Sequence, residues 1–492
     1  MQAATGWHRL AVQRLLMAAS IPLVLLSFAC RPVGAQPQPA APVQGAQPQS
    51  ARPASLTEVW RAAAQSDKEY AVARAAHAAA QPRREQAAAL WRPTVGLVGS
   101  VGVASHQSEI SGARFSAPGF GQSSGVGFGT SVTGGSASRW AVSAAQPLYD
   151  PKRRAEQQLL AISVDLADLQ WQAAGQSLML RTAERYFDLA LAEETVRALR
   201  QQLDAVQRAA TEARDRFQLG AVPITDTHEA GARLAALRAQ LLAADSELLI
   251  KRELLADATG LPAGALKAYL PAGRTAGPPP LPLQFWLDEA RAGHPGLRAQ
   301  GLAAELAKRE AVKHGRSSAA TIELVAQLGR DRLSGSGDFG RAGSTGTNGM
   351  IGVQLSVPLF TGGYRSAREE EALRLADKAA AEVERGREQV AQQVRSAWLG
   401  LSVGAERVRA LEQSLGASVA RRDATQLGHE VGERTTLDLL NAENEAVAAR
   451  LALAHGRIGL LMDRLRLTAL AGRLDEAALR AAEGELAAAA VR

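Results

Sequence analysis

The feature that most constrains the fold of this chain is an internal duplication. Pro147 and Pro358 each stand just before a long helical pattern, and their positions differ by 211 residues. Gly220 and Gly432 each stand where such a pattern ends, and their positions differ by 212 residues. Two landmarks of the first half thus recur in the second half at the same spacing to within one residue. This repeat predicts one structure built from two similar halves, although a chain of 492 residues would otherwise suggest several domains.

The N-terminal segment, residues 1–35, is predicted to be a secretory signal peptide. Basic residues precede a short apolar run, and Val33-Gly34-Ala35 has the small-x-small pattern of a cleavage site. The only cysteine of the chain, Cys30, stands at the end of the apolar run, which offers lipid attachment as a second interpretation. Ser27-Phe28-Ala29 fits a lipobox poorly, because an aliphatic residue is expected three positions before the cysteine. Residues 36–54 are rich in Pro, Gln and Ala and predict a disordered linker.

Segments of alternating apolar and polar residues predict a pair of β-strands in each half, over about 94–148 and about 321–360. The clearest apolar positions are Ile322, Leu324, Ala326 and Leu328 in one strand and Ile351, Val353, Leu355 and Val357 in the next. Each run covers about 9–11 residues, the length of a tilted strand that crosses a bilayer. The Gly- and Ser-rich segments 105–137 and 330–348 are expected to be loops. An ordinary soluble hairpin alternates in the same way, so the pattern alone leaves that alternative open.

Very long helical patterns follow each strand pair. From Lys152 to Phe217 there is no proline, and apolar residues recur at steps of three and four, as they do in the second copy. A helix of this length would be about 100 Å long and would need coiled-coil packing against neighbours. Gly220 and Pro223 in the first copy, and Gly432 in the second, suit turns that reverse the chain. Each half is therefore predicted to be a strand pair that continues into a long helical hairpin.

The predicted organisation has a helical segment before each strand pair and a helical hairpin after it. The predicted parts are a first repeat over 55–259 with its hairpin over about 151–259, an irregular connector over 260–283, a second repeat over 284–472 with its hairpin over about 362–472, and a C-terminal tail over 473–492. The tail is rich in alanine, and the sequence pattern does not place it.

Composition and motifs argue against several other classes of protein. The net charge is +7, but 49 acidic residues nearly balance 56 basic ones. The two kinds are interleaved along the helical patterns, which is typical of solvated helix faces and not of a nucleic-acid-binding surface. The sequence has neither a cysteine pair nor an H-E-x-x-H or G-x-x-x-x-G-K-[ST] motif, so we expect a non-enzyme without metal or cofactor. After residue 35, no apolar run of about 18 residues predicts a membrane-spanning helix.

The number of predicted strands has a consequence for assembly. Four strands cannot close a transmembrane barrel, since known single-chain examples have about eight or more. Open strand edges in lipid would leave backbone groups unpaired, at a cost of several kcal/mol each. If the strands span a membrane, several chains must therefore share one barrel. Three chains would supply about twelve strands, but the strand count alone does not choose a trimer over a dimer.

The residues at the duplicated landmarks resemble the TolC-type family of outer-membrane efflux and secretion channels, over roughly residues 55–475. The duplicated strand-to-helix segments that carry the resemblance are Pro147-Leu148-Tyr149 and Pro358-Leu359-Phe360-Thr361-Gly362-Gly363. The duplicated hairpin turns are Phe217-Gln218-Leu219-Gly220-Ala221-Val222-Pro223-Ile224-Thr225-Asp226 and Val431-Gly432-Glu433-Arg434-Thr435-Thr436-Leu437-Asp438-Leu439-Leu440-Asn441-Ala442. One such segment would be a weak signal, whereas two of each at matching spacing are specific.

The resemblance implies an α+β membrane protein of the outer membrane. It implies a homotrimer whose chains form a 12-stranded β-barrel, with four strands per chain, continued by a long periplasmic α-helical coiled-coil tunnel. The implied duct is passive, is surrounded by outer-membrane lipid and is closed at its inner end by the hairpin turns. The implied partners are a periplasmic adaptor protein and an inner-membrane transporter of the RND or ABC type, with either small molecules or a secreted polypeptide as cargo. An exported coiled-coil adhesin without channel activity is the alternative.

In this family, polar contacts between neighbouring hairpins hold the inner end closed. The matching positions here are Thr225 and Asp226 in the first hairpin, with Arg434 and Asp438 in the second. A charge-assisted bond between an arginine and a carboxylate can hold two helices together and be broken by a modest competing force. The alternative for Arg434 and Asp438 is a local pair four residues apart on one helix face, worth about 0.2–0.5 kcal/mol. A threefold axis would bring three copies of Asp438 into an acidic ring.

Two positions depart from the family's pattern. His429 stands where the family has a tyrosine that ties the closed end, and Asn441 stands where it often has a second acidic residue. We therefore expect a less negative ring and, at His429, a titratable contact in the closed end. A solvated histidine at a helix end is the alternative for His429.

Overall fold

The structure is a computed structural model that describes residues 55–119, 121–271, 281–338 and 340–487. Contacts divide the chain into Met1–Ser50 and Ala51–Arg492, and the account below concerns the second unit. The predicted signal peptide, Cys30 and the linker over 36–54 therefore lie outside the described residues, as do parts of the predicted connector and tail.

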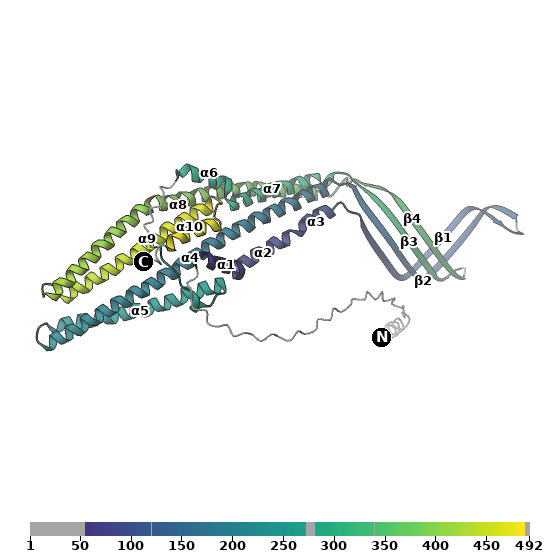
Figure 1. Ribbon diagram of the computed structural model, residues 1–492. Helices are drawn as coiled ribbons and strands as arrows, with labels where there is room; N and C mark the ends of the chain where they lie inside the picture. Colours follow the sequence, from purple (N-terminus) through teal and green to yellow (C-terminus); the bar gives the residue numbers. More distant parts are fainter. Residues whose placement is uncertain (1–54, 120, 272–280, 339, 488–492) are drawn as a thin grey trace, which may run out of the picture. The chain divides into compact units, whose positions relative to one another are not determined.

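The helices and strands follow one another in two similar halves (Figure 1). The first half contains α1 (Leu56–Ser66), α2 (Lys68–Ala80), α3 (Pro82–Ala89), β1 (Thr94–Ala117), β2 (Gly121–Tyr149), α4 (Pro151–Gln218) and α5 (Ile224–Thr259), followed by a 3₁₀ turn (Ala263–Ala265). The second half contains α6 (Leu283–Gly293), α7 (Pro295–Gly315), a 3₁₀ turn (Arg316–Ser318), β3 (Thr321–Gly337), β4 (Gly340–Ser356), α8 (Tyr364–Glu430), α9 (Thr436–Leu470) and α10 (Glu476–Ala487).

Proline residues and polar N-cap residues determine where α1, α3 and α4 begin. Ser55 begins α1 with a capping box, in which its side chain accepts from the Glu58 N–H while the Glu58 carboxylate accepts from the Ser55 N–H. Pro82 occupies the first position of α3, where the missing N–H costs nothing. The same rule starts α4 at Pro151, directly after its N-cap Asp150. The long helix expected over 152–217 is thus α4, which spans 68 residues.

The strands are longer than the sequence analysis expected. β1 and β2 have 24 and 29 residues, and β3 and β4 have 17 each, against the 9–11 expected. The expectation that 105–137 and 330–348 are loops is wrong. Both segments form antiparallel ladders that continue to tight turns, with Ala117 opposite Gly121 and Gly337 opposite Gly340. Glycine and serine are tolerated there because each strand has a partner that completes its backbone hydrogen bonds.

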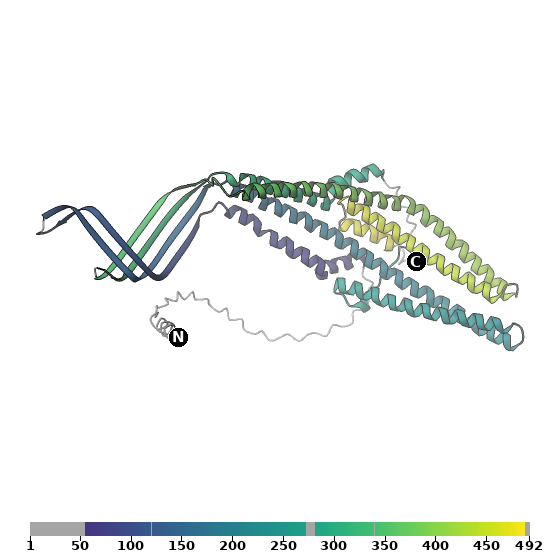
Figure 2. The ribbon, with the colours of Figure 1, turned by 180° about the vertical axis from the view of Figure 1, so that it is seen from behind.

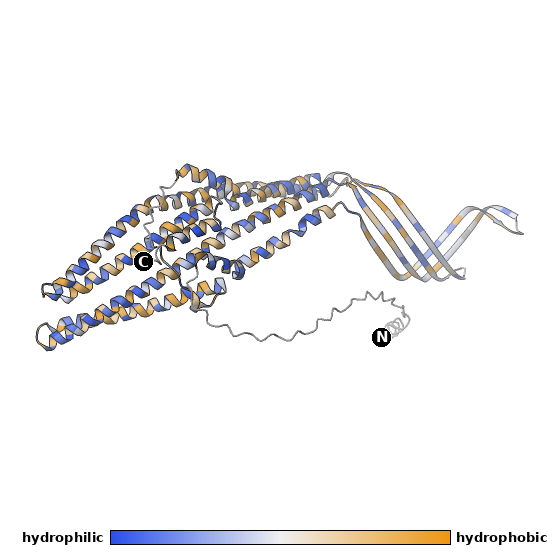
Figure 3. Cartoon of the chain, viewed as in Figure 1, coloured by the Kyte–Doolittle hydropathy of each residue, from blue (hydrophilic) through white to orange (hydrophobic). Residues whose placement is uncertain are grey.

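Within the described residues the strands form one antiparallel sheet in the order β1-β2-β3-β4, with β1 and β4 at its edges. Two successive rows of cross-strand neighbours are Val95, Ala144, Ala326 and Ile351, and then Leu97, Val142, Leu328 and Gly349. Because alternate residues share a face, the register collects apolar side chains on one side of the sheet. We call this face the apolar band, and its members are Val95, Leu97, Val101, Val103, Val142, Leu324, Leu328, Ile351, Val353 and Leu355, all exposed in the single chain. Figure 3 shows the alternation along the strands.

The helices pair into two hairpins, α4 with α5 and α8 with α9. The turns of both hairpins lie at the end of the helices away from the sheet (Figures 1 and 2). Among the described residues, no helix combines the length and the apolar character that crossing a membrane requires.

The main hydrophobic core lies where helices of both halves meet the C-terminal segment. Its largest buried members are Leu56, Tyr186, Phe187, Leu255, Leu461 and Leu479. The tail, which the sequence pattern left unplaced, forms α10, and Leu479 is fully buried in this core. An ion pair between Arg61 of α1 and Glu476 of α10 adds to the contact. Residues 473–487 are therefore part of the fold, and 488–492 lie outside the described residues.

Candidate functional site

The turns of the two helical hairpins are built alike. In each, a glycine N–H donates to the carbonyl three residues earlier, and the next N–H donates to the carbonyl five residues earlier. The glycines are Gly220 and Gly432, whose φ angles of 71° and 82° lie in the left-handed region that favours glycine. Pro223 and Thr435 then stand at the N-caps of α5 and α9. The duplicated sequence therefore produces a duplicated turn.

The two turns lie next to each other within one chain. A small cavity of about 130 Å³ lies between the start of α5 and the start of α9. Its lining residues are Asp226, Glu229 and Ala230 from the first hairpin and Thr435, Thr436, Leu437 and Leu440 from the second. Of the predicted gate residues, Thr225 donates its hydroxyl to the Asp226 carboxylate at 3.3 Å, which is a contact between neighbours on α5.

Asp438 has a local structural role. Thr435 donates both its N–H (3.1 Å) and its hydroxyl (2.9 Å) to the Asp438 carboxylate, and the Asp438 N–H donates to the Thr435 hydroxyl (3.1 Å). This is a complete capping box at the start of α9. The backbone bond from Thr435 and then its hydroxyl bond hold the pKa of the Asp438 carboxyl below its ordinary value, and the charges of Arg434 and Arg421 act in the same direction.

Arg434 lies before α9 begins, so the alternative that Arg434 and Asp438 form a local pair on one helix face is wrong. The Arg434 N–H donates to the Gly428 carbonyl at 3.1 Å, which fixes its backbone in the turn. Within the described part of the chain, the Arg434 guanidinium makes no hydrogen bond or ion pair. Its charge is therefore free for a group outside this chain.

His429 is buried, with 5% of its surface exposed, so the alternative of a solvated histidine is wrong. Its Nδ1 lies 3.1 Å from the Arg434 carbonyl, which accepts, so Nδ1 carries a proton. The other nitrogen, Nε2, is buried without a hydrogen bond to any described residue and lies 3.5 Å from the carboxylate of Glu212 on α4. Arg216 also binds that carboxylate, at 2.8 Å. His429 of the second hairpin therefore lies against Glu212 of the first.

Asn441 joins the two hairpins through an arginine that the sequence analysis did not single out. Arg233 of α5 donates to the Asn441 side-chain oxygen at 2.5 Å. One helical turn further along α9, Asn444 accepts from Gln202 of α4 at 3.3 Å. Arg233 is one of many charged residues interleaved on the helices, and nothing in the sequence pattern marks it.

Another contact between the hairpins lies deeper in the helical part. The side chain of Glu194 on α4 is 6% exposed and binds two arginines. Arg450 of α9 approaches it at 2.6 Å, and Arg197 of α4 itself approaches it at 2.7 Å. A buried carboxylate requires such pairing, because its desolvation is costly. A buried Glu194 was also not predictable from its sequence context.

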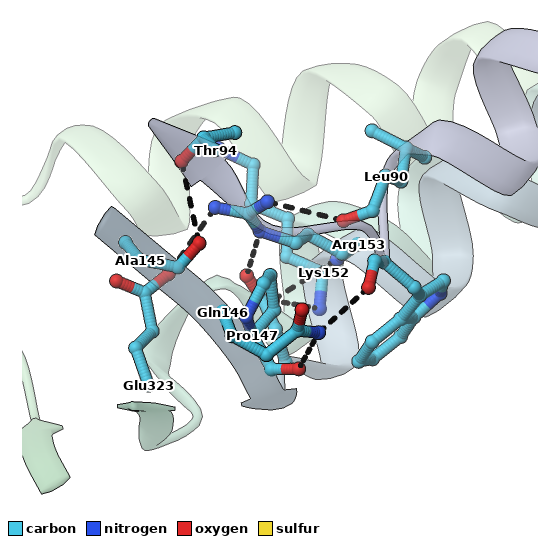
Figure 4. A network of polar contacts seen from close by, with 10 residues as sticks. Leu90, Thr94, Ala145, Gln146, Pro147, Lys152, Arg153 and Glu323 are labelled. Carbon is cyan, nitrogen blue, oxygen red and sulfur yellow. Dashed lines mark hydrogen bonds and ion pairs between the residues drawn. The ribbon is translucent and has the colours of Figure 1, made fainter. Parts of the chain in front are cut away.

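At the other end of α4, one arginine connects the strands to the helices (Figure 4). The Asp150 carboxylate caps α4 by accepting from the N–H groups of Lys152 (2.9 Å) and Arg153 (3.0 Å). The Arg153 guanidinium binds Asp150 (3.1 Å), the Leu90 carbonyl at the end of α3 (3.1 Å) and Glu323 of β3 (3.2 Å). This arginine therefore joins α3, α4 and β3 beside the predicted strand-to-helix turn.

The expectation that Pro147 stands in the first strand-to-helix turn is wrong, because Pro147 lies within β2 opposite Glu323, and the strand continues to Tyr149. Gln146 beside it donates to the carbonyl of Trp91 at 2.7 Å. The second turn depends on glycine instead. Gly362 and Gly363 have φ angles of 61° and 83°, and Gly363 is the N-cap of α8 without any side-chain cap.

Pro358 follows the end of β4, and its carbonyl accepts from Arg365 at 3.3 Å. The next two side chains, Leu359 and Phe360, are about nine-tenths exposed. Side-chain hydrogen bonds therefore stabilise the connection from β2 to α4, whereas the connection from β4 to α8 has an uncapped helix start and exposed apolar side chains.

Two kinds of catalytic site, a metal site and a serine nucleophile, can be compared with the described residues. No group of three or more His, Cys, Asp or Glu among them is placed to hold a metal ion. The sequence Gly121-Gln122-Ser123-Ser124-Gly125 matches G-x-S-x-G, but it lies inside β2 and not in the strand-to-helix turn that this motif needs.

Comparison with known proteins agrees with the duplicated architecture. The sequence pattern of the family described as outer membrane efflux protein matches residues 59–261 and 286–473. Outer membrane protein TolC of Escherichia coli is 26% identical over 349 residues, which cover 69% of this chain and 70% of that protein. Alkaline protease secretion protein AprF of Pseudomonas aeruginosa is 28% identical over 345 residues, which cover 68% of this chain and 69% of that protein.

Solved structures show the same fold. The outer membrane protein VceC of Vibrio cholerae aligns with a TM-score of 0.66 at 19% identity, covering 85% of this chain and 96% of VceC. The CmeC outer membrane channel of Campylobacter jejuni aligns with a TM-score of 0.70 at 14% identity, covering 88% of this chain and 89% of CmeC. Since the family pattern matches both repeats and most of the chain, the chain belongs to the outer membrane efflux protein family.

Proposed function

We propose that three copies of this chain form a passive exit duct, in which each sheet supplies four strands of one 12-stranded barrel. As a member of its family, the chain is an outer-membrane protein that serves efflux or secretion. The observation that carries the proposal is the four-stranded sheet with its apolar band and with no described strand paired to the outer edge of β1 or β4. Such edges cannot stay open in lipid, so each would pair with an edge of the next chain.

The helical hairpins would continue this barrel as a tunnel through the periplasm. α4 and α8 contain 68 and 67 residues, which correspond to helices about 100 Å long. Helices of this length need neighbours along their whole extent. In the single chain, α8 leaves much of its surface exposed, including Leu373, Leu399 and Leu427, and neighbouring chains would cover it.

The hairpin turns would form the gate of the tunnel. Arg434 has a guanidinium without a partner in the described chain, and Thr225 and Asp226 are the matching positions on the other hairpin. We assign to Arg434 a charge-assisted bond to a carboxylate of the neighbouring chain. Three copies of Asp438, each held ionised by its capping box, would form an acidic ring, and Asn441 in place of an acid makes that ring less negative.

Proteins of this family work with an adaptor and an inner-membrane transporter in tripartite systems. For this chain we propose a periplasmic adaptor protein and a transporter of the RND or ABC type. Relatives are named both for efflux, such as BepC of Brucella suis, and for protease secretion, such as AprF and PrtF. Deleting the gene and measuring both drug susceptibility and secreted protein would assign the cargo. The adhesin alternative finds no support in this family.

The test is the single-channel conductance of the purified trimer in a planar lipid bilayer. Wild type is compared with Arg434→Ser and with Arg409→Ser, a control in α8 whose arginine pairs, among the described residues, with Glu406 one turn away. We expect a small, steady wild-type conductance, a several-fold rise in Arg434→Ser and no change in the control. A pore unchanged by Arg434→Ser would remove the gating role from Arg434, and folded trimers without any pore would overturn the duct.

A further inference from the structure

On β3 and β4 the apolar band ends, on the side away from the helices, at a group of arginines, whereas on β1 the same face continues with Val101 and Val103. Beyond Leu328, the next residues of β3 on the same face are Arg330 and Arg332. On β4, Arg341 lies on this face as well, opposite Ser336. All three arginines are exposed. We call Arg330, Arg332 and Arg341 the arginine cluster.

The regular register establishes that the cluster shares the face of the apolar band. The β3–β4 ladder runs without a bulge from the pair Thr321 and Ser356 to the pair Gly337 and Gly340. Alternation is therefore unbroken, and even-numbered residues of β3 share one face from Ile322 onward. Arg330 follows Leu328 by two residues, about 7 Å along the strand.

An indole borders the cluster on the neighbouring strand. Trp140 of β2 lies directly opposite Arg330 on the same face. Tryptophan is enriched where the apolar core of a membrane meets the polar headgroups. The row of Trp140 and Arg330 thus has the composition expected at the boundary of the apolar band.

The cluster is not neutralised within its own sheet. Within the described residues, the guanidinium groups of the cluster make no hydrogen bond or ion pair. The neighbouring acid Asp331 points to the opposite face, where Arg139 binds it. Glu323 also lies on the opposite face, where it binds Arg153.

One further acid lies close by. Asp338 stands in the β3–β4 turn, where its backbone N–H donates to Ser131 at 2.7 Å. Even with Asp338 counted, the face carries an excess of positive charge just outside the apolar band.

The positions of these charges match phosphate groups at a membrane surface. An arginine next to an apolar region can lay its methylene chain along that region and direct its guanidinium toward the headgroups. The guanidinium fork binds phosphate oxygens in a bidentate manner. In the proposed duct the helices lie in the periplasm, and the β1–β2 and β3–β4 turns, at the end of the strands away from the helices (Figure 1), therefore lie on the exterior side.

We propose that the arginine cluster binds the phosphate groups of lipids in the outer leaflet of the outer membrane. The expected ligand is a glycolipid whose sugar headgroup carries phosphate, because its acyl chains would lie on the apolar band while its phosphates reach the cluster. This inference rests on the proposed insertion of the sheet into the membrane.

The experiment measures lipid binding by purified trimer with native mass spectrometry. The probe is a diglucosamine lipid with two phosphates, and its enzymatically dephosphorylated form and inorganic phosphate are measured beside it. The test variant is Arg330→Gln with Arg332→Gln and Arg341→Gln. The control variant is Arg374→Gln with Arg387→Gln and Arg409→Gln, which removes the same charge from exposed positions on α8.

Each arginine near an anionic membrane surface contributes about fivefold to binding, so we expect the test variant to bind the phosphorylated lipid at least about tenfold more weakly than wild type. The control variant should bind like wild type, and the dephosphorylated lipid should not distinguish the three proteins. Binding by the test variant within about twofold of wild type overturns the proposal. An equal loss in the control variant also overturns it, and displacement of the lipid by inorganic phosphate at millimolar concentration reassigns the cluster to free phosphate.

Conductance of the same preparations separates this inference from the proposed function. A test variant that forms pores like wild type is folded and inserted, so its lipid binding is then informative. If wild type forms no pore, the proposed duct fails, whereas normal pores with unchanged lipid binding refute the arginine cluster alone.

Discussion

The two helical hairpins are almost equal in length but are held differently. α4 and α5 contain 68 and 36 residues, and α8 and α9 contain 67 and 35. In the half of α4 nearest its turn, residues are buried at regular intervals from Glu194 to Ala213. In the corresponding half of α8, no described residue is buried between Val408 and His429.

The starts of the hairpins next to the sheet, at Asp150 for α4 and Gly363 for α8, differ in the same way, and we call them the roots. α4 begins with Asp150 as a side-chain cap that Arg153 connects to α3 and β3. α8 begins at Gly363 with no side-chain cap. Near its turn, the second hairpin contacts the first through a small apolar cluster around Leu440 and a few polar contacts. We infer that the first hairpin is the fixed part of each chain and the second is the part that moves.

The largest effect is expected at the root of the first hairpin. Asp150→Ala removes a cap and leaves Arg153 with one carboxylate fewer, which we expect to destabilise the protein by about 2 kcal/mol. The measurement is the temperature at which the purified trimer dissociates and unfolds. Thr361→Ala at the second root is the matched control and should change stability by less than about 0.5 kcal/mol, since no side chain caps α8. Equal effects at both roots would contradict the difference between the hairpins.

A smaller effect is expected from the contact between Arg450 and Glu194. Arg450→Ala removes the partner from the second hairpin, and because Arg450 is 41% exposed we expect a loss of about 1.5 kcal/mol. The open-to-closed ratio would rise about tenfold, which single-channel recordings measure directly. Arg197→Ala removes the other partner of Glu194 within α4 alone and serves as the control. An equal rise in both variants would mean that the charge of Glu194, and not the connection between hairpins, controls the pore.

The hydrogen bond between Arg233 and Asn441 should contribute less. Arg233→Ala removes a bond from a charged donor, worth about 1 kcal/mol, and should raise the open probability about fivefold. The control is Arg238→Ala, an exposed arginine on the same helix. No difference between the two variants would remove this contact from the closing mechanism.

The smallest effect concerns His429, whose Nδ1 donates to the Arg434 carbonyl at 3.1 Å and whose Nε2 lies 3.5 Å from Glu212 of α4. His429→Gln removes this buried ring and keeps a polar side chain, so we expect the open probability to rise about twofold. Single-channel recordings of wild type and variant at one pH measure it. An unchanged open probability would refute the role of His429.

The sequence predicted the features that depend on periodicity and on glycine, and missed those that depend on partners. Gly220 and Gly432 stand in identical turns because the left-handed backbone needs glycine, which a sequence displays directly. The lengths of β1 and β2 were missed because Gly and Ser form strands when a neighbouring strand completes their hydrogen bonds, and composition does not display that neighbour.

The candidate site shows the same limit. Arg434 and Asp438 are four residues apart and could be placed on one helix, yet the capping box of Thr435 starts that helix after Arg434. Arg153, Arg233 and Glu194 were not selected, because a charged residue on a solvated face and one between two hairpins have the same local sequence character.

The most direct test is the conductance of a variant that lacks three of the polar contacts between the hairpins, Arg233→Ala with His429→Gln and Arg450→Ala, in a planar bilayer beside wild type. If the second hairpin moves against a fixed first hairpin, the variant should conduct several-fold more than wild type while remaining a folded trimer. A folded trimeric variant with wild-type conductance would contradict the account, because the contacts between the hairpins would then not hold the duct closed.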